Sequence, residues 1–147
     1  MIDKETIELI KKHEGFEPRV YECTAGYDTI GYGFAIKDLH LSESISTAIL
    51  TEIVARLEIQ LIEKFEWYTS APKEVKAVVI DMCYNLGVTG FSKFRKTIYY
   101  LETEQYEEAS VELLDSLYAK QVPNRANENS EILSNIKEEN KNANPNW

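Results

Sequence analysis

One segment of this chain, residues 16–36, has the alternation of β-structure, whereas the residues before and after it have helical spacing. Arg19 to Cys23 alternates, Thr24 to Gly26 supplies turn residues, and Tyr27 to Phe34 is rich in aromatic and β-branched residues. This pattern predicts a β-hairpin, with or without a third short strand. The glycines between the aromatic residues indicate close backbone approach or bulges.

A first helix is predicted before this segment. Asp3 can act as its N-cap, because a short acceptor side chain satisfies the free N–H groups of the first turn. Ile7 and Ile10 share one face of this helix, and Glu14 follows them by one turn. Gly15 can end it, since glycine readily takes the left-handed conformation found at helix ends.

After Ile36 the apolar spacing is helical to the end of the chain. A long amphipathic helix is predicted over residues 46–66, with Ser46 as its N-cap. A second helix opens at Pro72 and closes at Gly87, and its apolar residues wrap most of its circumference. A helix of that kind is expected to be buried on nearly all sides, at the centre of a helical lobe.

The remaining helices are expected near residues 92–102 and 104–118 and from Pro123 onward, and the polar tail from Lys137 to Trp147 is expected to fray. The predicted fold class is therefore α+β and mostly α, in a single two-lobed domain. Its parts are predicted to be a small N-terminal α+β lobe, a connecting helix and a larger helical lobe, over residues 1–45, 46–68 and 69–147.

Composition excludes several classes of protein. Apolar residues make up 44% of the chain and charged residues 28%, and no apolar run is long enough to span a membrane. The start lacks the basic and apolar order of a secretion signal, so we expect a soluble, monomeric cytosolic product without stable membrane insertion. The net charge of −9 argues against nucleic-acid partners, which need clustered Lys and Arg.

The cysteines and histidines predict neither a disulfide framework nor a metal site. Cys23 and Cys83 lie far apart in the sequence and form no CxxC pair. His13 and His40 have no ligand spacing between them or with the cysteines. We therefore expect no metal and no cofactor.

Glu14 is a candidate acid. The carbonyl groups at the end of a helix carry roughly half a negative charge, which should raise the pKa of a carboxyl placed there. A carboxylic acid that stays protonated near neutrality can protonate a leaving oxygen. The alternative is an ordinary exposed glutamate at a helix end, which is the common case.

Cys23 and Thr29 are candidates for holding a water molecule. If residues 24–26 form the loop, Cys23 faces Tyr27 and Tyr21 faces Thr29 across the hairpin. Cys23 and Thr29 then point to the same face, roughly 7 Å apart as diagonal neighbours. The alternatives are an inert, half-buried cysteine and a threonine chosen for strand propensity.

The spacing of these three residues resembles that of a known family. Eight residues separate Glu14 from Cys23, five separate Cys23 from Thr29, and the flanks are His13-Glu14-Gly15 and Thr29-Ile30-Gly31-Tyr32-Gly33. The pattern resembles the phage lysozymes of glycoside hydrolase family 24, the T-even type above all, in the version with Cys rather than Asp. Further resemblances to this family are Met82 to Gly87, Thr89 to Phe91, and Val122 to Ala126.

The resemblance implies a lysozyme fold with a cleft between two lobes, and a muramidase that hydrolyses peptidoglycan with inversion. It implies that Glu14 is the general acid and that Cys23 and Thr29 activate the attacking water. Arg125 would approach Glu14, and Tyr84 would line the sugar site. A pore-forming holin would release the enzyme from the host cytoplasm to the wall for cell lysis.

The sequence departs from the family pattern at three positions. Phe34 stands where most relatives have His, and its expected acidic partner falls near Leu57, so an ion pair is replaced by apolar contact. Glu112 stands where an uncharged polar residue is expected. A catalytically weak peptidoglycan-binding or virion-associated protein is therefore the alternative function. Zinc-dependent amidases need His and Cys ligands that this chain lacks.

Overall fold

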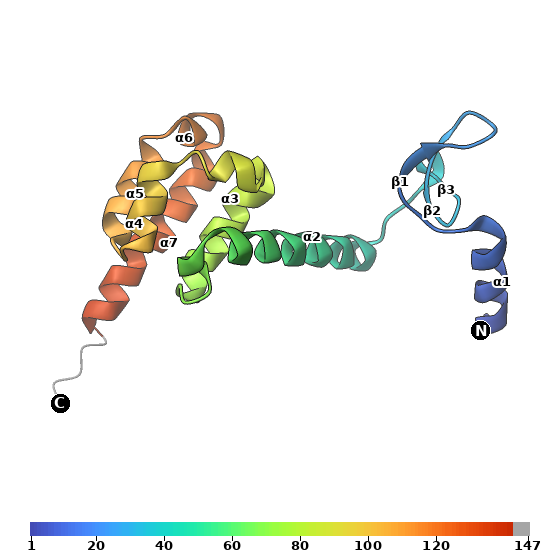
Figure 1. The fold of residues 1–147 in the computed structure, drawn as a ribbon, viewed down its shortest axis with the longest axis horizontal. Helices are drawn as coiled ribbons and strands as arrows, with labels where there is room; N and C mark the ends of the chain where they lie inside the picture. Colours follow the sequence, from blue (N-terminus) through green and yellow to red (C-terminus); the bar gives the residue numbers. More distant parts are fainter. Residues whose placement is uncertain (143–147) are drawn as a thin grey trace. The chain divides into compact units, whose positions relative to one another are not determined.

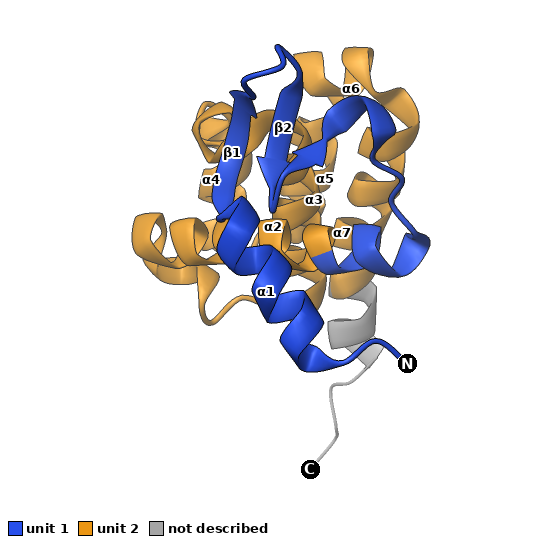
Figure 2. Ribbon diagram, turned by 90° about the vertical axis from the view of Figure 1, so that its right-hand side faces the viewer, with its two compact units in different colours: residues 1–48 blue, residues 49–147 orange. Residues whose placement is uncertain are grey.

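The computed structural model describes residues 1–142, with the side chains of residues 1–136. The chain forms two compact units, Met1–Ala48 (unit 1) and Ile49–Trp147 (unit 2), which Figure 2 shows in different colours. The fold is α+β and mostly α, as predicted. The elements follow one another along the chain as Figure 1 labels them.

Unit 1 contains a helix followed by a small antiparallel sheet. The sheet has the order β1-β2-β3, so the hairpin is confirmed and the third short strand is present. β1 pairs with β2, and β2 pairs with β3. The elements are α1 (Lys4–Glu14), β1 (Glu17–Glu22), β2 (Asp28–Gly31), β3 (Phe34–Ala35) and the 3-10 helix η1 (Ile36–Asp38).

Both predicted caps of α1 are confirmed. The Asp3 carboxylate accepts hydrogen bonds from the backbone N–H of Thr6 at 2.8 Å and from its hydroxyl at 2.9 Å. At the other end, the backbone N–H of Gly15 donates to the carbonyl of Lys11 at 2.9 Å. Gly15 has φ 70° but an extended ψ of 161°, so the chain leaves the helix directly toward β1.

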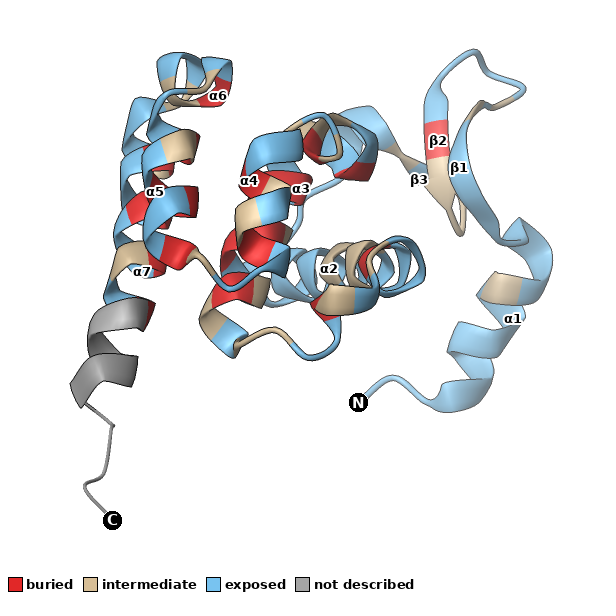
Figure 3. Ribbon diagram, turned by 60° about the vertical axis from the view of Figure 1, so that its left-hand side comes forward, coloured by how far each residue is buried: buried red, intermediate tan, exposed pale blue. Residues whose placement is uncertain are grey.

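Unit 2 holds the hydrophobic core, which Figure 3 shows in red on its helices. The central helix α3 contributes the largest share of buried residues, as its apolar sequence predicted. Around it, α5 packs against both α4 and α7. The elements are η2 (Glu66–Tyr68), α3 (Lys73–Phe91), α4 (Arg95–Glu102), α5 (Tyr106–Leu114), α6 (Leu117–Gln121) and α7 (Pro123–Asn142), preceded by α2 (Glu43–Lys64), which begins in unit 1.

One predicted helix boundary is wrong. α2 begins at Glu43 rather than at 46, because the hydroxyl of Ser42 accepts the N–H of Ile45 at 3.2 Å and so caps the helix. Gly87 interrupts α3 as predicted, because its φ of 73° and ψ of 161° are not helical. A second helical stretch follows this kink and ends at Phe91.

The structure also differs from the helices predicted after residue 104. The helix expected over 104–118 is two helices, α5 and α6, because Ser116 caps a new helix by accepting from the N–H of Ala119. α7 starts at Pro123 as predicted and continues to Asn142, so the tail expected to fray from Lys137 is helical up to that residue. Its remainder lies outside the described residues. No helix among those described is long and apolar enough to cross a membrane.

Candidate active site

Glu14 is the last residue of α1, and its carboxyl lies directly against the backbone of Gly33. A Cβ atom placed on Gly33 would lie 2.9 Å from the carboxyl carbon of Glu14 and would collide with its Oε2. Gly33 also has a φ of +75°, which side-chain-bearing residues rarely adopt. The missing side chain at Gly33 therefore leaves the space that the carboxyl of Glu14 occupies.

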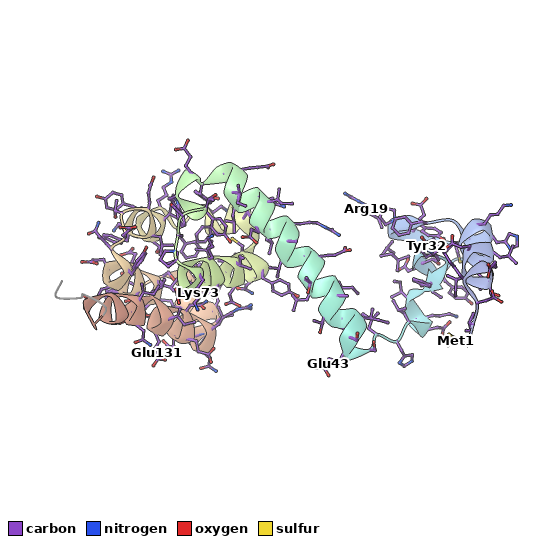
Figure 4. All side chains as sticks on the ribbon, turned by 90° about the horizontal axis from the view of Figure 1, so that it is seen from below. Met1, Arg19, Tyr32, Glu43, Lys73 and Glu131 are labelled. Carbon is purple, nitrogen blue, oxygen red and sulfur yellow. The ribbon has the colours of Figure 1, made fainter. Side chains whose placement is uncertain are left out.

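Aromatic and cationic contacts hold the end of α1 to this turn. Tyr32, labelled in Figure 4, packs its ring against Phe16 with 5.4 Å between centroids. The ammonium of Lys11 lies 5.5 Å from the centroid of the same ring. Together with the contact between Glu14 and Gly33, these interactions fix where the helix ends relative to the sheet.

The hairpin brings Cys23 and Thr29 together in the predicted register. Tyr21 pairs with Thr29, and the backbone N–H of Cys23 donates to the carbonyl of Tyr27 at 2.9 Å. The Thr29 hydroxyl is 3.0 Å from that same carbonyl, so one backbone oxygen accepts from both residues. Thr29 is 4% exposed, whereas Cys23 is half-buried.

The Cys23 thiol lies within the curve of the hairpin loop, and its pKa is lowered. The largest cause is hydrogen bonding to the backbone of Tyr27, followed by that of Ala25, with the Thr29 hydroxyl contributing as well. Burial, by contrast, raises the pKa of Cys83 to about 12, which makes that cysteine inert.

Arg125 begins a polar network in unit 2. Its guanidinium donates two hydrogen bonds to the Asp81 carboxylate, Nε to Oδ2 and Nη2 to Oδ1, both at 2.8 Å. Asn129 donates from Nδ2 to Oδ2 of Asp81 at 2.9 Å and to the Tyr118 hydroxyl at 3.2 Å. This network lines a pocket of about 500 Å³, and the role that the resemblance assigns to Arg125 beside Glu14 stays a prediction.

Tyr84 lies one turn after Asp81 on α3 and is 49% exposed. The pKa of Arg125 is raised mainly by Asp81, and Tyr118 and Tyr84 add smaller effects, which places Tyr84 at the edge of the same network. Its predicted contact with a sugar is untested. Sequence reasoning missed Asp81 and Asn129, although an aspartate inside an otherwise apolar helix was a usable signal.

We expect Asp81→Asn to lower the free energy of unfolding by about 1 kcal/mol, because it weakens charge-assisted hydrogen bonds that are partly exposed. Hydrogen bonding to Arg125, and then to Asn129, lowers the pKa of Asp81. A lowered folded pKa stabilises the protein above the ordinary pKa of Asp, and this stability is lost as pH falls through the folded value. In urea unfolding, the difference in free energy of unfolding between wild type and Asp81→Asn should therefore be constant near neutral pH and should disappear below about pH 4.

Asp115→Asn, which replaces a carboxylate at the exposed end of α5, is the control and should show no such gap. If the stability difference for Asp81→Asn were the same at pH 3 as at pH 7, the interaction would not depend on the charge of the Asp81 carboxylate.

Among the described residues, no cluster of His, Cys, Asp and Glu has the arrangement of a metal site.

Comparisons with known proteins identify related sequences. The sequence model of the phage lysozyme family matches residues 11–137, a span that includes all five predicted site residues. A probable T4-type lysozyme 2 from Dictyostelium discoideum is 25% identical over 150 aligned positions, covering 82% of this chain and 88% of its own length. A probable T4-type lysozyme 1 from the same organism is 23% identical, with the same coverage.

Proposed function

Because this chain belongs to the phage lysozyme family, we propose that it hydrolyses the β-1,4 bond between N-acetylmuramic acid and N-acetylglucosamine in peptidoglycan. One observation carries this proposal. The carboxyl of Glu14 rests on the Gly33 backbone, in the same unit as the hairpin that joins Cys23 to Thr29. Glycosidic hydrolysis with inversion requires a general acid and a base that activates water on the opposite face of the sugar, and this unit contains candidates for both.

In the proposed reaction, Glu14 donates its proton to the glycosidic oxygen as the bond from that oxygen to the anomeric carbon breaks. A water molecule held by Cys23 and Thr29 attacks the anomeric carbon from the opposite face and transfers one proton to the Cys23 thiolate. The new hydroxyl therefore has inverted configuration. Thr29 suits this role because its hydroxyl is already oriented by a backbone carbonyl.

Mass spectrometry of digested peptidoglycan tests the bond that is cleaved. Glycosidic cleavage creates new reducing-end sugars, whereas an amidase or peptidase releases free peptide stems. NMR of the first product would reveal its anomeric configuration, and a retained configuration would contradict the proposed water attack. Absence of any cleavage would favour the alternative, a peptidoglycan-binding or virion-associated protein of the same fold.

The proposed biological role is lysis of a bacterial host. We propose that the protein accumulates in the host cytoplasm and reaches the wall through a holin pore. The net charge of −9 gives no attraction to a polyanionic cell wall. Access of the protein to the wall would therefore depend on its release through the pore rather than on long-range attraction. Expression with and without a holin should therefore differ in lysis, while the amount of intracellular enzyme stays equal.

Cys23→Asp is expected to raise kcat/KM at pH 6 by about tenfold or more, because a carboxylate is fully ionised there and a thiol is mostly neutral. The hairpin backbone lowers the pKa of Cys23, so the wild-type rate should rise with pH as the thiolate forms. Cys23→Ser should lack that rise, since a hydroxyl does not ionise in this range. Profiles of kcat/KM against pH that superimpose for all three proteins would leave Cys23 without a catalytic role.

A further inference from the structure

Tyr27 contacts both candidate water-binding residues through its own backbone. Its carbonyl accepts the N–H of Cys23 at 2.9 Å and the hydroxyl of Thr29 at 3.0 Å. Hydrogen bonding to its backbone is also the largest cause of the lowered pKa of the Cys23 thiol. A displacement of this one residue would therefore disturb both groups that the proposed reaction uses to hold water.

Tyr27 lies in the hairpin loop, between the end of β1 and the start of β2. Two backbone hydrogen bonds close this loop, from Cys23 to Tyr27 and from the N–H of Gly26 to the carbonyl of Cys23, both at 2.9 Å. Solvent-exposed backbone hydrogen bonds open with little free energy, so a loop held by them alone is easily disturbed. A contact from another element would hold Tyr27 more firmly.

The register of the sheet brings Lys37 opposite Tyr27. β2 pairs with β3 so that Thr29 faces Ala35. In an antiparallel pair, two positions back along one strand match two positions forward along the other and lie on the same face. The next pair on that face is therefore Tyr27 with Lys37, which belongs to η1, directly after β3.

The ammonium of Lys37 lies 3.6 Å from the centroid of the Tyr27 ring. The other contacts of this kind among the described residues, made by Lys11 and Lys76, are longer, at 5.5 Å and 5.6 Å. A cation over the face of an aromatic ring is attracted by the negative charge of the π system. Lys37 forms no salt bridge within the described part of the chain, so no carboxylate competes with the ring for its charge.

We propose that Lys37 is a positioning residue, whose ammonium holds the ring of Tyr27 and thereby the backbone that orients the two water-binding side chains. In this role it acts through Tyr27 rather than through contact with the substrate. Its effect on the rate rests on the proposed function, whereas its effect on the loop does not. An ordinary surface lysine would change neither the hydrogen bonds of the loop nor the rate.

Amide hydrogen exchange of the full chain, followed by NMR, measures the opening of the loop. Lys37→Met keeps a long side chain but removes its charge, and the N–H of Cys23 should exchange about two- to fivefold faster, as expected for the loss of an exposed cation–π contact. Lys37→Arg should leave this exchange unchanged, because a guanidinium also stacks on aromatic rings. The N–H of Gly15, bonded to Lys11 at the end of α1, should exchange at the wild-type rate in both variants.

Tyr27→Leu removes the other partner of the contact. It should speed the exchange of the Cys23 N–H as much as Lys37→Met does, and the double variant should exchange no faster than either single variant, because one shared interaction is lost. Lys4→Met removes the same charge from an exposed position of α1 and should have no effect. Additive effects in the double variant would mean that the two side chains act independently, which would overturn the proposal.

Kinetics on soluble peptidoglycan fragments tests the positioning role. Lys37→Met should lower kcat by about two- to fivefold, in line with the loosening of the loop. It should leave KM unchanged, because substrate contacts remain and only the orientation of the attacking water is disturbed. Lys37→Arg should restore kcat. A higher KM at unchanged kcat would show a direct contact of Lys37 with the substrate and would overturn the positioning role.

The two measurements distinguish this inference from the proposed function. If wild type cleaves peptidoglycan and Lys37→Met matches it in both exchange and kcat, this inference is wrong and the proposed function stands. Faster exchange at unchanged kcat and KM would also overturn the inference, since the loop would then be held without any effect on the water. A wild type that does not cleave, with exchange responding as expected, would contradict the proposed function and support the hold of Lys37 on the loop.

Discussion

Glu14→Gln is expected to lower the rate of peptidoglycan hydrolysis by about two to four orders of magnitude, which is the usual contribution of a positioned general acid. The amide keeps the size and shape of the side chain, so it can still rest on Gly33. It has no acidic proton to give to the glycosidic oxygen. Loss of turbidity of a cell-wall suspension, followed over time, measures the effect.

The same helix offers a control for this substitution. Glu5 is an exposed residue in the first turn of α1, and Glu5→Gln makes the identical chemical change at the opposite end. It should leave hydrolysis within about twofold of wild type, because surface substitutions away from special features have small effects. Activity of Glu14→Gln within tenfold of wild type would exclude Glu14 as the acid.

Gly33→Ala should reduce hydrolysis by about a hundredfold, since displacing a catalytic group by 1 Å can cost that much. The new Cβ would lie 2.9 Å from the carboxyl carbon of Glu14, and the carboxyl must move to relieve the contact. The positive φ of Gly33 adds strain of roughly 1–2 kcal/mol. Activity reports the displacement of the Glu14 carboxyl, and the free energy of unfolding reports the backbone strain at position 33, so both are measured.

Gly87→Ala separates backbone strain from the contact with Glu14. Gly87 has a φ of +73°, comparable to that of Gly33, but a Cβ added to it would have no neighbouring heavy atom within 4 Å. Both variants should therefore lose similar stability, whereas hydrolysis should fall much further for Gly33→Ala. If the two variants lost activity to the same extent, backbone strain alone would explain the loss and the contact with Glu14 would be unimportant.

Local patterns predicted most of the secondary structure. The caps of α1 and the hairpin register follow from short-range chemistry: a side chain that caps its own helix, and a loop whose length sets the pairing. The start of α2 was misplaced because Ser42, Ser44 and Ser46 can each cap a helix, and spacing alone does not choose among them. Ser42 is the one whose hydroxyl accepts a helical N–H.

The family resemblance selects Glu14, Cys23 and Thr29 as candidates, and the hairpin register that brings the last two together is confirmed. Their catalytic roles stay predictions. Contacts between distant residues were not predicted. The carboxyl of Glu14 resting on Gly33 depends on how α1 leaves its cap, and the hydrogen bonds of Arg125 to Asp81 span 44 positions of sequence.

The junction of α1 with the sheet makes the chain unequal in its tolerance of insertions and deletions. An α-helix turns by about 100° per residue, so one residue added within the last turn of α1 would move the Glu14 carboxyl away from Gly33. A residue added before Lys4 would lengthen the helix at its far end and leave the acid in place. Length variation in natural or designed relatives should therefore accumulate ahead of this helix and be rare between it and β1.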